Sequence, residues 1–304
     1  MSSLPSVHLS RERSLASDFA ERSLTTRRRE IARLQEQIST GYRVNRPSDD
    51  ATAYAEARRM DVLIDRYEQY ERTIGSARAW VDATQTALDD LADLMTEAYE
   101  RGVQGQSDAL SPADKEILAG RLEALRDQVF DRLNTRHDGE YLFAGTRTTE
   151  PAFSRSGTTI TYEGNTDPRL RPIGPGVTLD ISIDGESVVD TGAGFTITEA
   201  LQDMIDALRA DDAGQVATAL DRLVTARDHV IARSSDAGNL GDRLNVAEAQ
   251  LRSADRTAQA RRSDAQDADL AEVLVNFQKE QTHLQAALQV TASVLQTSLI
   301  DYLR

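Results

Sequence analysis

The chain has 304 residues and a formal net charge of −15, with 50 acidic residues against 35 lysines and arginines. An acidic chain repels the phosphates of nucleic acids and of anionic membranes, so its charge argues against both as general partners. It contains no cysteine, which excludes disulfides, thiolate metal sites and cysteine nucleophiles. Hydrophobic residues make up 39% of the chain and aromatic residues 5%, which favours long helices sharing thin apolar seams over a thick globular core.

The first predicted element is an amphipathic helix that ends at Gly41. Its apolar residues recur at intervals of seven and of three or four, which is typical of a coiled-coil seam: Leu24, Ile31, Leu34 and Ile38. Gly41 can adopt the left-handed conformation that ends a helix. The start of the chain lacks the apolar core of a cleavable signal peptide, and no apolar run approaches the ~20 residues that cross a bilayer, so we expect neither feature.

Two further helices are predicted before residue 140. Pro47 disfavours helix at Arg46, and Ser48 is expected to cap a helix of about 50 residues that ends at Gly102 and Gly105. Its seam comprises Ala57, Met60, Ile64, Tyr67, Ile74, Val81, Leu88 and Met95. The pair Ser111-Pro112 predicts the start of another helix, which runs to about His137.

Residues 144–194 differ in kind from the flanking segments. They hold eight of the 17 glycines and four of the seven prolines. Alternating apolar residues from Val177 to Ile183 predict a half-buried strand, followed by a tight turn at Asp184-Gly185, and residues 158–162 predict a second strand. We expect a small inserted β domain, after which helix resumes near Thr198 with breaks at Gly214 and at residues 238–241.

The last 38 residues, 267–304, form an unbroken helical pattern without glycine or proline. Gln281 and Thr291 are polar residues within its narrow seam, and such residues fix the register and the partner number of a coil. The apolar members of the seam are Leu270, Leu274, Phe277, Leu284, Leu288, Leu295, Leu299 and Tyr302. This seam needs a partner, either at the other end of the chain or on another copy. The alternative is a pair of ordinary amphipathic helices packed on one globular domain.

The predicted fold is therefore mainly α: a long antiparallel helical bundle or coiled coil built from both chain ends, with a small inserted β-rich domain. We expect three domains. They are an inner terminal coiled-coil domain (1–45 with 265–304), a helical rod domain (46–143 with 195–264) and an outer β-rich domain (144–194).

The sequence offers no catalytic constellation. Its histidines, at positions 8, 137, 229 and 283, are scattered, and Glu280 with His283 forms a single E-x-x-H motif where a di-iron bundle would need two such motifs and two more glutamates. No phosphate-binding loop, nucleophile elbow or metal-ligand cluster is present in the sequence. We expect no enzymatic activity, no cofactor and no metal site.

Three segments carry a resemblance to a known family. The segment LQEQISTGYRVNRPSDDATAYA, residues 34–55, resembles the N-terminal signature of bacterial flagellins and their hook-associated relatives, and the C-terminal helix resembles the matching C-terminal signature. The signature positions here are Gly41, Arg43, Asn45, Pro47, Ser48, Asp49 and Asp50. The segment LNTRHDGEYLFAGTRTTEPAF, residues 133–153, resembles the hook–filament junction subfamily, and flagellins lack it. Its signature positions are Tyr141, Leu142, Phe143, Gly145 and Thr146.

The resemblance implies a structural subunit that joins hook to filament, with the terminal seams acting in subunit assembly. It implies unfolded export through the flagellar type III apparatus, without signal cleavage, to the extracellular hook–filament junction. The implied partners are copies of the chain in a ring, the hook-side junction protein, flagellin and a flagellar export chaperone, with no nucleic acid and no membrane. The alternative within the family is a flagellin that forms the filament. A more distant alternative, a signalling coiled coil, would lack the β insert.

Overall fold

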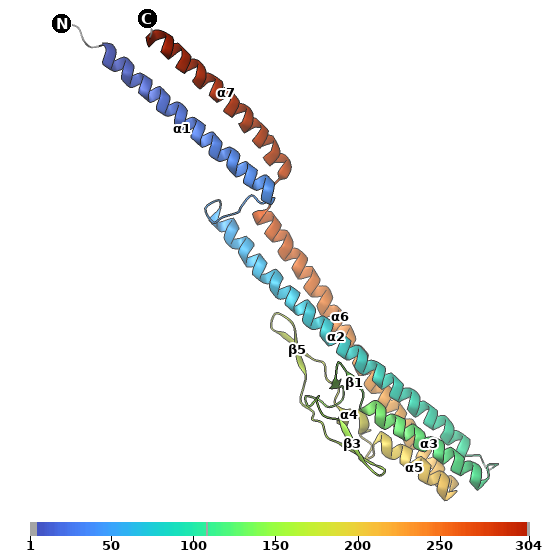
Figure 1. Cartoon of the computed structure of the whole chain (residues 1–304). Helices are drawn as coiled ribbons and strands as arrows, with labels where there is room; N and C mark the ends of the chain where they lie inside the picture. Colours follow the sequence, from blue (N-terminus) through green and yellow to red (C-terminus); the bar gives the residue numbers. More distant parts are fainter. Residues whose placement is uncertain (1–4, 108, 303–304) are drawn as a thin grey trace. The chain divides into compact units, whose positions relative to one another are not determined.

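The computed structural model describes the backbone of residues 5–107 and 109–302, most of which is helical (Figure 1). Side chains are described for fewer residues near the two ends, from Asp18 at the start to Ala292 at the end. The long helices are α1 (Pro5–Thr40), α2 (Ala51–Gly105), α3 (Pro112–Leu133), α5 (Ile197–Ala210), α6 (Ala213–Gln266) and α7 (Leu270–Tyr302). The prediction of a mainly helical fold with a small β-rich insert is confirmed.

The strands of the described residues form antiparallel two-stranded pairs between α3 and α5. They are β1 (Arg136–His137) with β2 (Glu140–Tyr141), β3 (Phe153–Ser156) with β4 (Thr159–Tyr162), and β5 (Leu170–Gly174) with β6 (Val177–Asp180). In the second pair, Phe153 lies opposite Tyr162 and Ser156 opposite Thr159, which places the predicted strand at residues 158–162 almost where it was expected. A short helix, α4 (Gly185–Val189), follows β6.

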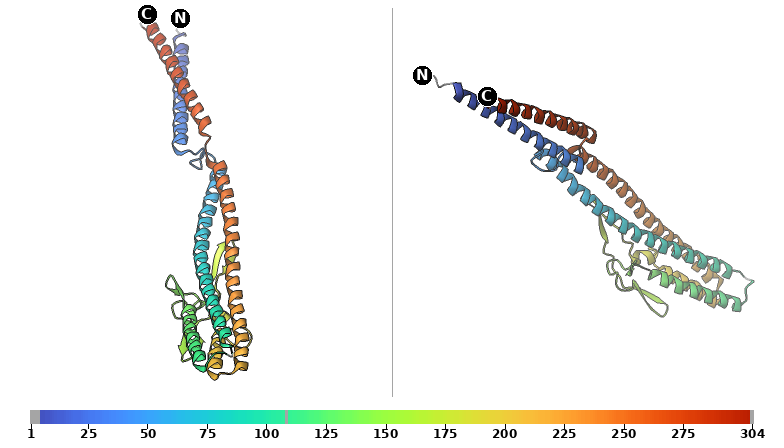
Figure 2. Two further views of the ribbon diagram at one scale, coloured as in Figure 1. Left: turned by 90° about the vertical axis from the view of Figure 1, so that its right-hand side faces the viewer. Right: turned by 45° about the horizontal axis from the view of Figure 1, so that its top comes forward.

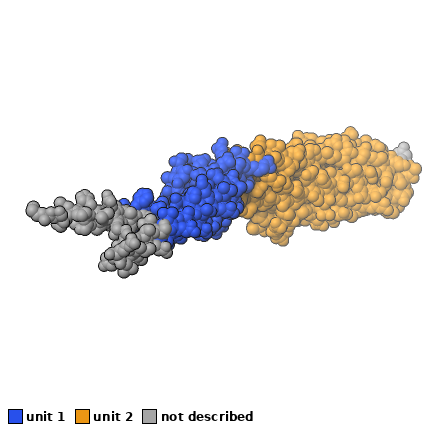
Figure 3. Space-filling view, turned by 90° about the horizontal axis from the view of Figure 1, so that it is seen from above, with its two compact units in different colours: residues 1–65, 255–304 blue, residues 66–254 orange. Residues whose placement is uncertain are grey.

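The chain divides into two compact units (Figure 3). Unit 1 comprises residues 1–65 and 255–304, and unit 2 comprises residues 66–254. Unit 1 has 16 basic and 17 acidic residues, whereas unit 2 has 19 basic and 33 acidic residues. Nearly all of the net negative charge therefore lies on unit 2. The three-domain division expected from the sequence stays a prediction.

One hydrophobic core fills unit 2. It joins buried residues of α2, α3, α5 and α6 to buried residues of the insert. The largest contributions from the insert are the fully buried side chains of Leu142, Phe143, Phe153, Leu179 and Ile181. The insert and the helices of unit 2 therefore share one continuous core. The buried helix residues are mostly alanine and leucine, and the insert adds the rings of Phe143 and Phe153 to the core beside Trp80 of α2.

Two helix boundaries differ from the prediction, and at one of them a side chain other than the expected one caps the backbone. Asp50, not Ser48, begins α2: its Oδ1 accepts hydrogen bonds from the amides of Thr52 and Ala53 at 3.1 and 3.0 Å. The prediction for Ser111 is confirmed by a capping box with Asp114. Helix α3 ends at Leu133, earlier than expected.

Three other local predictions were wrong. Strand β6 stops at Asp180, whose carboxylate accepts from the amide of Ser182 at 3.0 Å and so diverts that amide from a strand ladder. Asp184 caps α4, instead of starting a tight turn, by accepting from the amide of Ser187 at 2.8 Å. Helix α6 begins close to Gly214, as expected, but it continues without a break through residues 238–241.

The glycines at the end of α2 allow close approach. A Cβ on Gly102 would lie 2.8 Å from Leu220 Cδ2, and a Cβ on Gly105 would lie 2.3 Å from Leu208 Cδ2. An added Cβ would force these leucine side chains to shift, so glycine at both positions lets α2 pass closely over α5 and α6. None of the described helices is long and apolar enough to span a membrane.

The shared core of unit 2 predicts one cooperative unfolding transition. Phe153→Ala is expected to lower the free energy of unfolding by about 3–5 kcal/mol, because it empties a ring-sized volume in that core. Urea unfolding is followed by far-ultraviolet circular dichroism and by the fluorescence of Trp80, the single tryptophan. Both midpoints should fall together, and the exposed Val177→Ala should move them little. A shift of the fluorescence midpoint alone would contradict the shared core.

Candidate assembly interface

Helices α1 and α7 run side by side in unit 1 (Figures 1 and 2). Leu34 and Gln37 are buried on α1, and Val273 is buried on α7, with 3%, 4% and 8% of their surfaces exposed. Half-buried side chains extend this contact in both directions along the two helices. They are Leu24, Ile31 and Ile38 on α1, and Phe277, Leu284 and Thr291 on α7. The predicted pairing of the two terminal seams is thus present within one chain.

The predicted seam of α7 lies on two faces of the helix. Phe277 and Leu284 face α1, whereas Leu270, Leu274 and Leu288 remain 46%, 46% and 43% exposed. The prediction missed Val273. Val273 belongs to a second 4-3 pattern along α7. This pattern contains a glutamate and an alanine, so it is a weaker signal than the leucine-rich seam. The side chains of the remaining seam members, Leu295, Leu299 and Tyr302, lie outside the described residues.

The glutamate in the α1–α7 contact is paired across the helices. Glu280 Oε2 accepts a hydrogen bond from Arg27 Nη1 at 3.0 Å, and its other oxygen lies 3.6 Å from His283 Nδ1. Arg27 is 33% and Glu280 23% exposed, so the pair is partly desolvated. An ion pair at one point of a thin seam favours one register over its neighbours. The pair also engages the glutamate of the Glu280–His283 motif. No cluster of three metal-ligating side chains occurs among the described residues.

The first signature segment connects α1 to α2 and crosses the end of α6. Gly41 has a φ of +75° and ends α1 as expected. Gly41 O then accepts from the amide of Ala268 at 2.9 Å, and Gln266 O accepts from the amide of Arg43 at 2.7 Å. Tyr42 forms an antiparallel bridge with Asp267. We call residues 41–44 with 265–268 the crossing.

Polar side chains hold the crossing to the flanking helices. Arg43 Nη2 donates to Ala265 O at 3.0 Å, and the buried Gln37 donates to Arg43 O at 3.1 Å. Asp49 Oδ2 accepts from the amides of Asn45 and Arg46 at 3.0 and 2.9 Å. Asp49 thereby shapes the loop, whose outer residues are exposed: Pro47 and Ser48.

Asp50 closes the same loop. The amide of Ala53 is the main cause that lowers the pKa of its carboxyl, with contributions from Thr52 and from Arg43, whose Nη1 lies 3.7 Å away. The first signature is therefore a structural clamp, in which the structure brings together most of the predicted positions. Val44, 1% exposed, is a further member that the sequence motif did not single out.

The second signature segment is the centre of the insert. Leu142 and Phe143 are 1% and 0% exposed, and Phe143 O accepts from the amide of Gly185 at 2.8 Å. Tyr162 Oη lies 3.1 Å from Phe143 O and 2.7 Å from Asn165 O. The segment therefore ties β4 and α4 to the core.

Gly145 and Thr146 complete this arrangement. Gly145 has a φ of +66°, and a Cβ there would lie 1.9 Å from Asn165 O. The amide of Thr146 donates to Asn165 Oδ1 at 2.8 Å, and Asn165 Nδ2 donates back to Thr146 Oγ1 at 2.8 Å. The guanidinium of Arg136 lies 4.9 Å above the ring of Tyr141, the first residue of the signature.

Asn134 belongs to the same site but was not among the predicted positions. Its Oδ1 accepts from the amide of Phe153 at 3.0 Å, and its Nδ2 donates to Phe153 O at 3.1 Å. An asparagine close to the predicted end of a helix, within the signature segment, is the signal that could have indicated it. This pairing fixes β3 against the end of α3.

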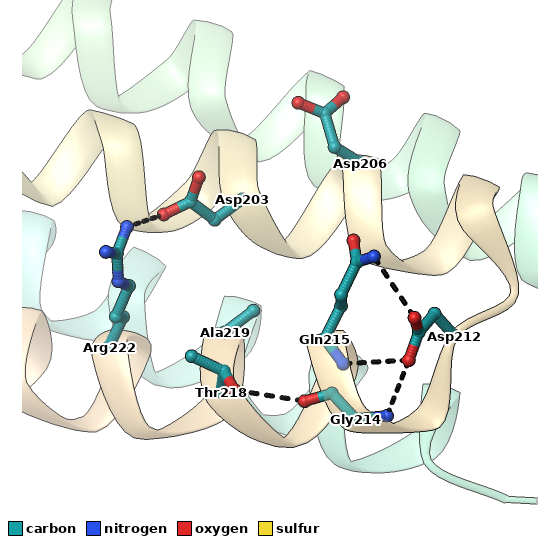
Figure 4. A pocket seen from close by; sticks show the side chains of 8 residues that line it. All are labelled: Asp203, Asp206, Asp212, Gly214, Gln215, Thr218, Ala219 and Arg222. Atoms are coloured by element: carbon teal, nitrogen blue, oxygen red, sulfur yellow. Dashed lines mark hydrogen bonds and ion pairs between the residues drawn. The ribbon is translucent and has the colours of Figure 1, made fainter.

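The acidic pocket between α5 and α6 has its carboxylates already engaged (Figure 4). This cavity of about 450 Å³ is lined by Asp203, Asp206 and Asp212. Asp203 pairs with Arg222, and Asp212 caps α6 by accepting from the amide of Gly214 at 2.8 Å. The carboxylate of Asp206 points away from the other two. The pocket therefore supports no acid–base pair.

Models of the bacterial flagellin N-terminal and C-terminal helical regions match residues 14–148 and 220–303 of this chain. Together the two models cover more than two thirds of the sequence, including the crossing, most of α1 and all of α7. The chain belongs to the bacterial flagellin family.

Curated relatives of two kinds are similar to this chain. Flagellar hook-associated protein 3 of Escherichia coli is 27% identical over 59% of this chain and 56% of its own length. The protein of the same name from Salmonella typhimurium is 31% identical over 44% of this chain and 42% of its own length. This chain thus spans about half the length of these relatives. Flagellin FlaB1 of Treponema pallidum is 24% identical over 94% of this chain and 96% of its own length.

A solved structure shares the fold. The flagellar junction protein FlgL from Legionella pneumophila superimposes with a TM-score of 0.60 and 15% identity, over 70% of this chain and all of that one. At this identity the likeness establishes the fold alone.

Gly145 provides a test of the second signature. Gly145→Ala is expected to cost more than about 3 kcal/mol of unfolding free energy, because it adds a clash with Asn165 O to a strained backbone. Gly157→Ala is the matched control: its φ is +65°, but open space surrounds it, so only the backbone cost of about 1–2 kcal/mol remains. Urea unfolding measures both variants. Equal losses of unfolding free energy in the two variants would show that the close contact between residue 145 and Asn165 does not affect stability.

The raised pKa of Tyr162 predicts that the protein loses stability at alkaline pH. Burial, with a smaller contribution from Asp184, raises the pKa of Tyr162 from 10.0 to about 12. Between pH 10 and 12 the unfolded chain releases this proton and the folded chain keeps it, so stability falls as pH rises, by about 1–2 kcal/mol once the part exposure of the ring is allowed for. Tyr162→Phe should flatten the slope of unfolding free energy over this range. Parallel slopes for wild type and variant would refute the assignment.

Proposed function

We propose that this chain is a hook-associated structural subunit of the bacterial flagellum that joins hook to filament as a ring of copies. The observation that carries the proposal is the unfinished burial of α7. Of the apolar side chains described on this helix, Leu270, Leu274, Val275, Leu288 and Val290 are 43–64% exposed. A helix that has already paired with α1 and still exposes these groups is suited to a second, intermolecular contact.

The charge distribution supports assembly through unit 1. With 16 basic and 17 acidic residues, unit 1 is close to neutral, so copies can approach there with little repulsion. The exposed apolar side chains of unit 1 include Leu270, Leu274 and Leu288 of the α7 seam, which we call the assembly face, and Phe19 of α1, which is 76% exposed. Neighbouring copies would bury these side chains, and each leucine that is now half-exposed would gain about 1 kcal/mol.

A filament-forming flagellin is the second candidate, and one observation favours it: a flagellin matches 94% of this chain. The second signature favours the hook-associated role, because the segment around Tyr141–Thr146 resembles the junction subfamily and forms the centre of the insert. The two candidates differ in one measurable property. A flagellin should polymerise into long filaments from purified monomer, whereas a junction subunit should not.

The remaining parts of the proposal follow from the family resemblance. The chain leaves the cell unfolded through the flagellar type III apparatus with the help of an export chaperone, and acts at the extracellular hook–filament junction. Its neighbours there are the hook-side junction protein and flagellin. The role is mechanical, and the proposal includes no catalytic step, no cofactor, no metal site and no binding to nucleic acid or membrane.

Leu288→Asp tests the assembly face. The substitution places a charge on the exposed side of α7, so the monomer should fold and be secreted normally, while burial of the charge in an assembled junction costs several kcal/mol and blocks assembly. In a strain lacking the native gene, electron microscopy should show hooks without filaments, with this chain and flagellin in the medium.

Ile231→Asp is the matched control. Ile231 is 46% exposed on α6 in unit 2, close to the 43% of Leu288, and its substitution should leave filaments and swimming intact. Normal filaments with Leu288→Asp would overturn the assembly face. Hooks with normal filaments in the strain lacking the gene, or long filaments from purified protein alone, would overturn the adaptor role.

A further inference from the structure

Helix α6 passes without interruption through a segment of poor helix formers. Residues 233–242 read RSSDAGNLGD, with two glycines, two serines, an asparagine and two aspartates among ten residues. Glycine is the least favourable helix residue after proline, and the small polar residues compete with the helix by bonding to the backbone. The local sequence therefore opposes the conformation that this segment adopts.

Neither glycine is explained by packing or by backbone geometry. Both are helical and neither has a positive φ. A Cβ on Gly238 would meet Gln85 Nε2 at 3.8 Å, an ordinary contact, and a Cβ on Gly241 would meet nothing within 4 Å. By contrast, a Cβ on Gly102 or Gly105 would clash with α5 and α6. Alanine would therefore fit at positions 238 and 241, and it would stiffen the helix.

Residues 235–243, the central part of this stretch, lie between two anchors that hold α6 on α2. On one side, the buried Ser234 donates a hydrogen bond to Asp89. On the other side, Arg78 Nη2 donates to Asn245 Oδ1 at 2.6 Å and pairs with Glu248. A local distortion of α6 between these anchors need not shift the register of the two helices.

We infer that residues 235–243 of α6 form a compliance segment, in which the helix opens or bends locally while the anchors on either side keep α6 attached to α2. On α2 the exposed Gly75 also has nothing within 4 Å of its Cβ position, so both helices carry a loosened site near the second anchor. The segment would let the two helices yield under load without separating. That use rests on the proposed function, but the local flexibility does not.

Hydrogen exchange of the full chain, followed by mass spectrometry, tests the inference. The amides of residues 238–245 donate across the weak segment, and they should exchange about tenfold or more faster than those of residues 223–230 in the same helix. In the double variant Gly238→Ala/Gly241→Ala, exchange in the segment should slow by about tenfold or more, with no loss of thermal stability.

Gly120→Ala is the matched control, because Gly120 is a helical glycine on α3 with nothing within 4 Å of its Cβ position. It should slow exchange in α3 and leave residues 238–245 unchanged. Wild-type protection equal to that of residues 223–230, or exchange unaltered in the double variant, would overturn the inference. A lower melting temperature in the double variant would overturn it as well, since it would show that packing requires the glycines.

The exchange experiment separates this inference from the proposed function. Filament formation in the strain lacking the native gene tests the adaptor role, whatever the exchange rates are. If both hold, the double variant should still assemble filaments, but more filaments should detach from their hooks under flow. Equal detachment of wild type and variant would refute the mechanical use of the segment.

Discussion

The crossing is the constraint on which the two ends of the chain depend. Helices α1 and α7 share little buried apolar surface. Burial of so small a surface does not by itself determine the register in which the two helices pair. The crossing instead uses directional hydrogen bonds: Gln266 O accepts from Arg43, and Gly41 O accepts from Ala268. These bonds fix where α1 ends and where α7 begins. The two helices then run in a register that places Arg27 opposite Glu280, where they form their ion pair.

Unit 2 solves the same shortage of apolar surface by a different means. Its helices also lack bulk, and the insert folds over them to complete one core. Arginines stack on several of the few aromatic rings, most closely where the guanidinium of Arg169 lies 3.8 Å above the centre of the Trp80 ring. The acidic excess of unit 2 favours solubility, while the near-neutral unit 1 can approach its copies. Burial and charge thus divide between the units according to the task proposed for each.

Local patterns predicted most of the helices, because periodicity and caps are properties of neighbouring residues. The glycine at position 41 and the capping box at Ser111 are examples. Prediction failed where distant contacts decide the outcome. Burial of Ala237 and Leu244 keeps α6 continuous across its glycines, and the amide of Gly185 donates to the distant Phe143 O where an Asp-Gly pair elsewhere begins a tight turn. The assembly positions were predicted as a single stripe, since spacing identifies a face but not which half of it meets α1.

That division of the stripe gives α7 two separate tasks. Phe277 and Leu284 contact α1 within the chain, so changes there act on folding of unit 1 before any other copy is involved. Leu274 and Leu288 lie on the exposed side, so changes there leave the folded monomer nearly unaltered and act on what it can join. One helix must therefore satisfy two packings at once. The many alanines and glutamines of α7 suit both contacts. A more apolar helix would expose a large hydrophobic surface in the monomer before a contact with another copy forms.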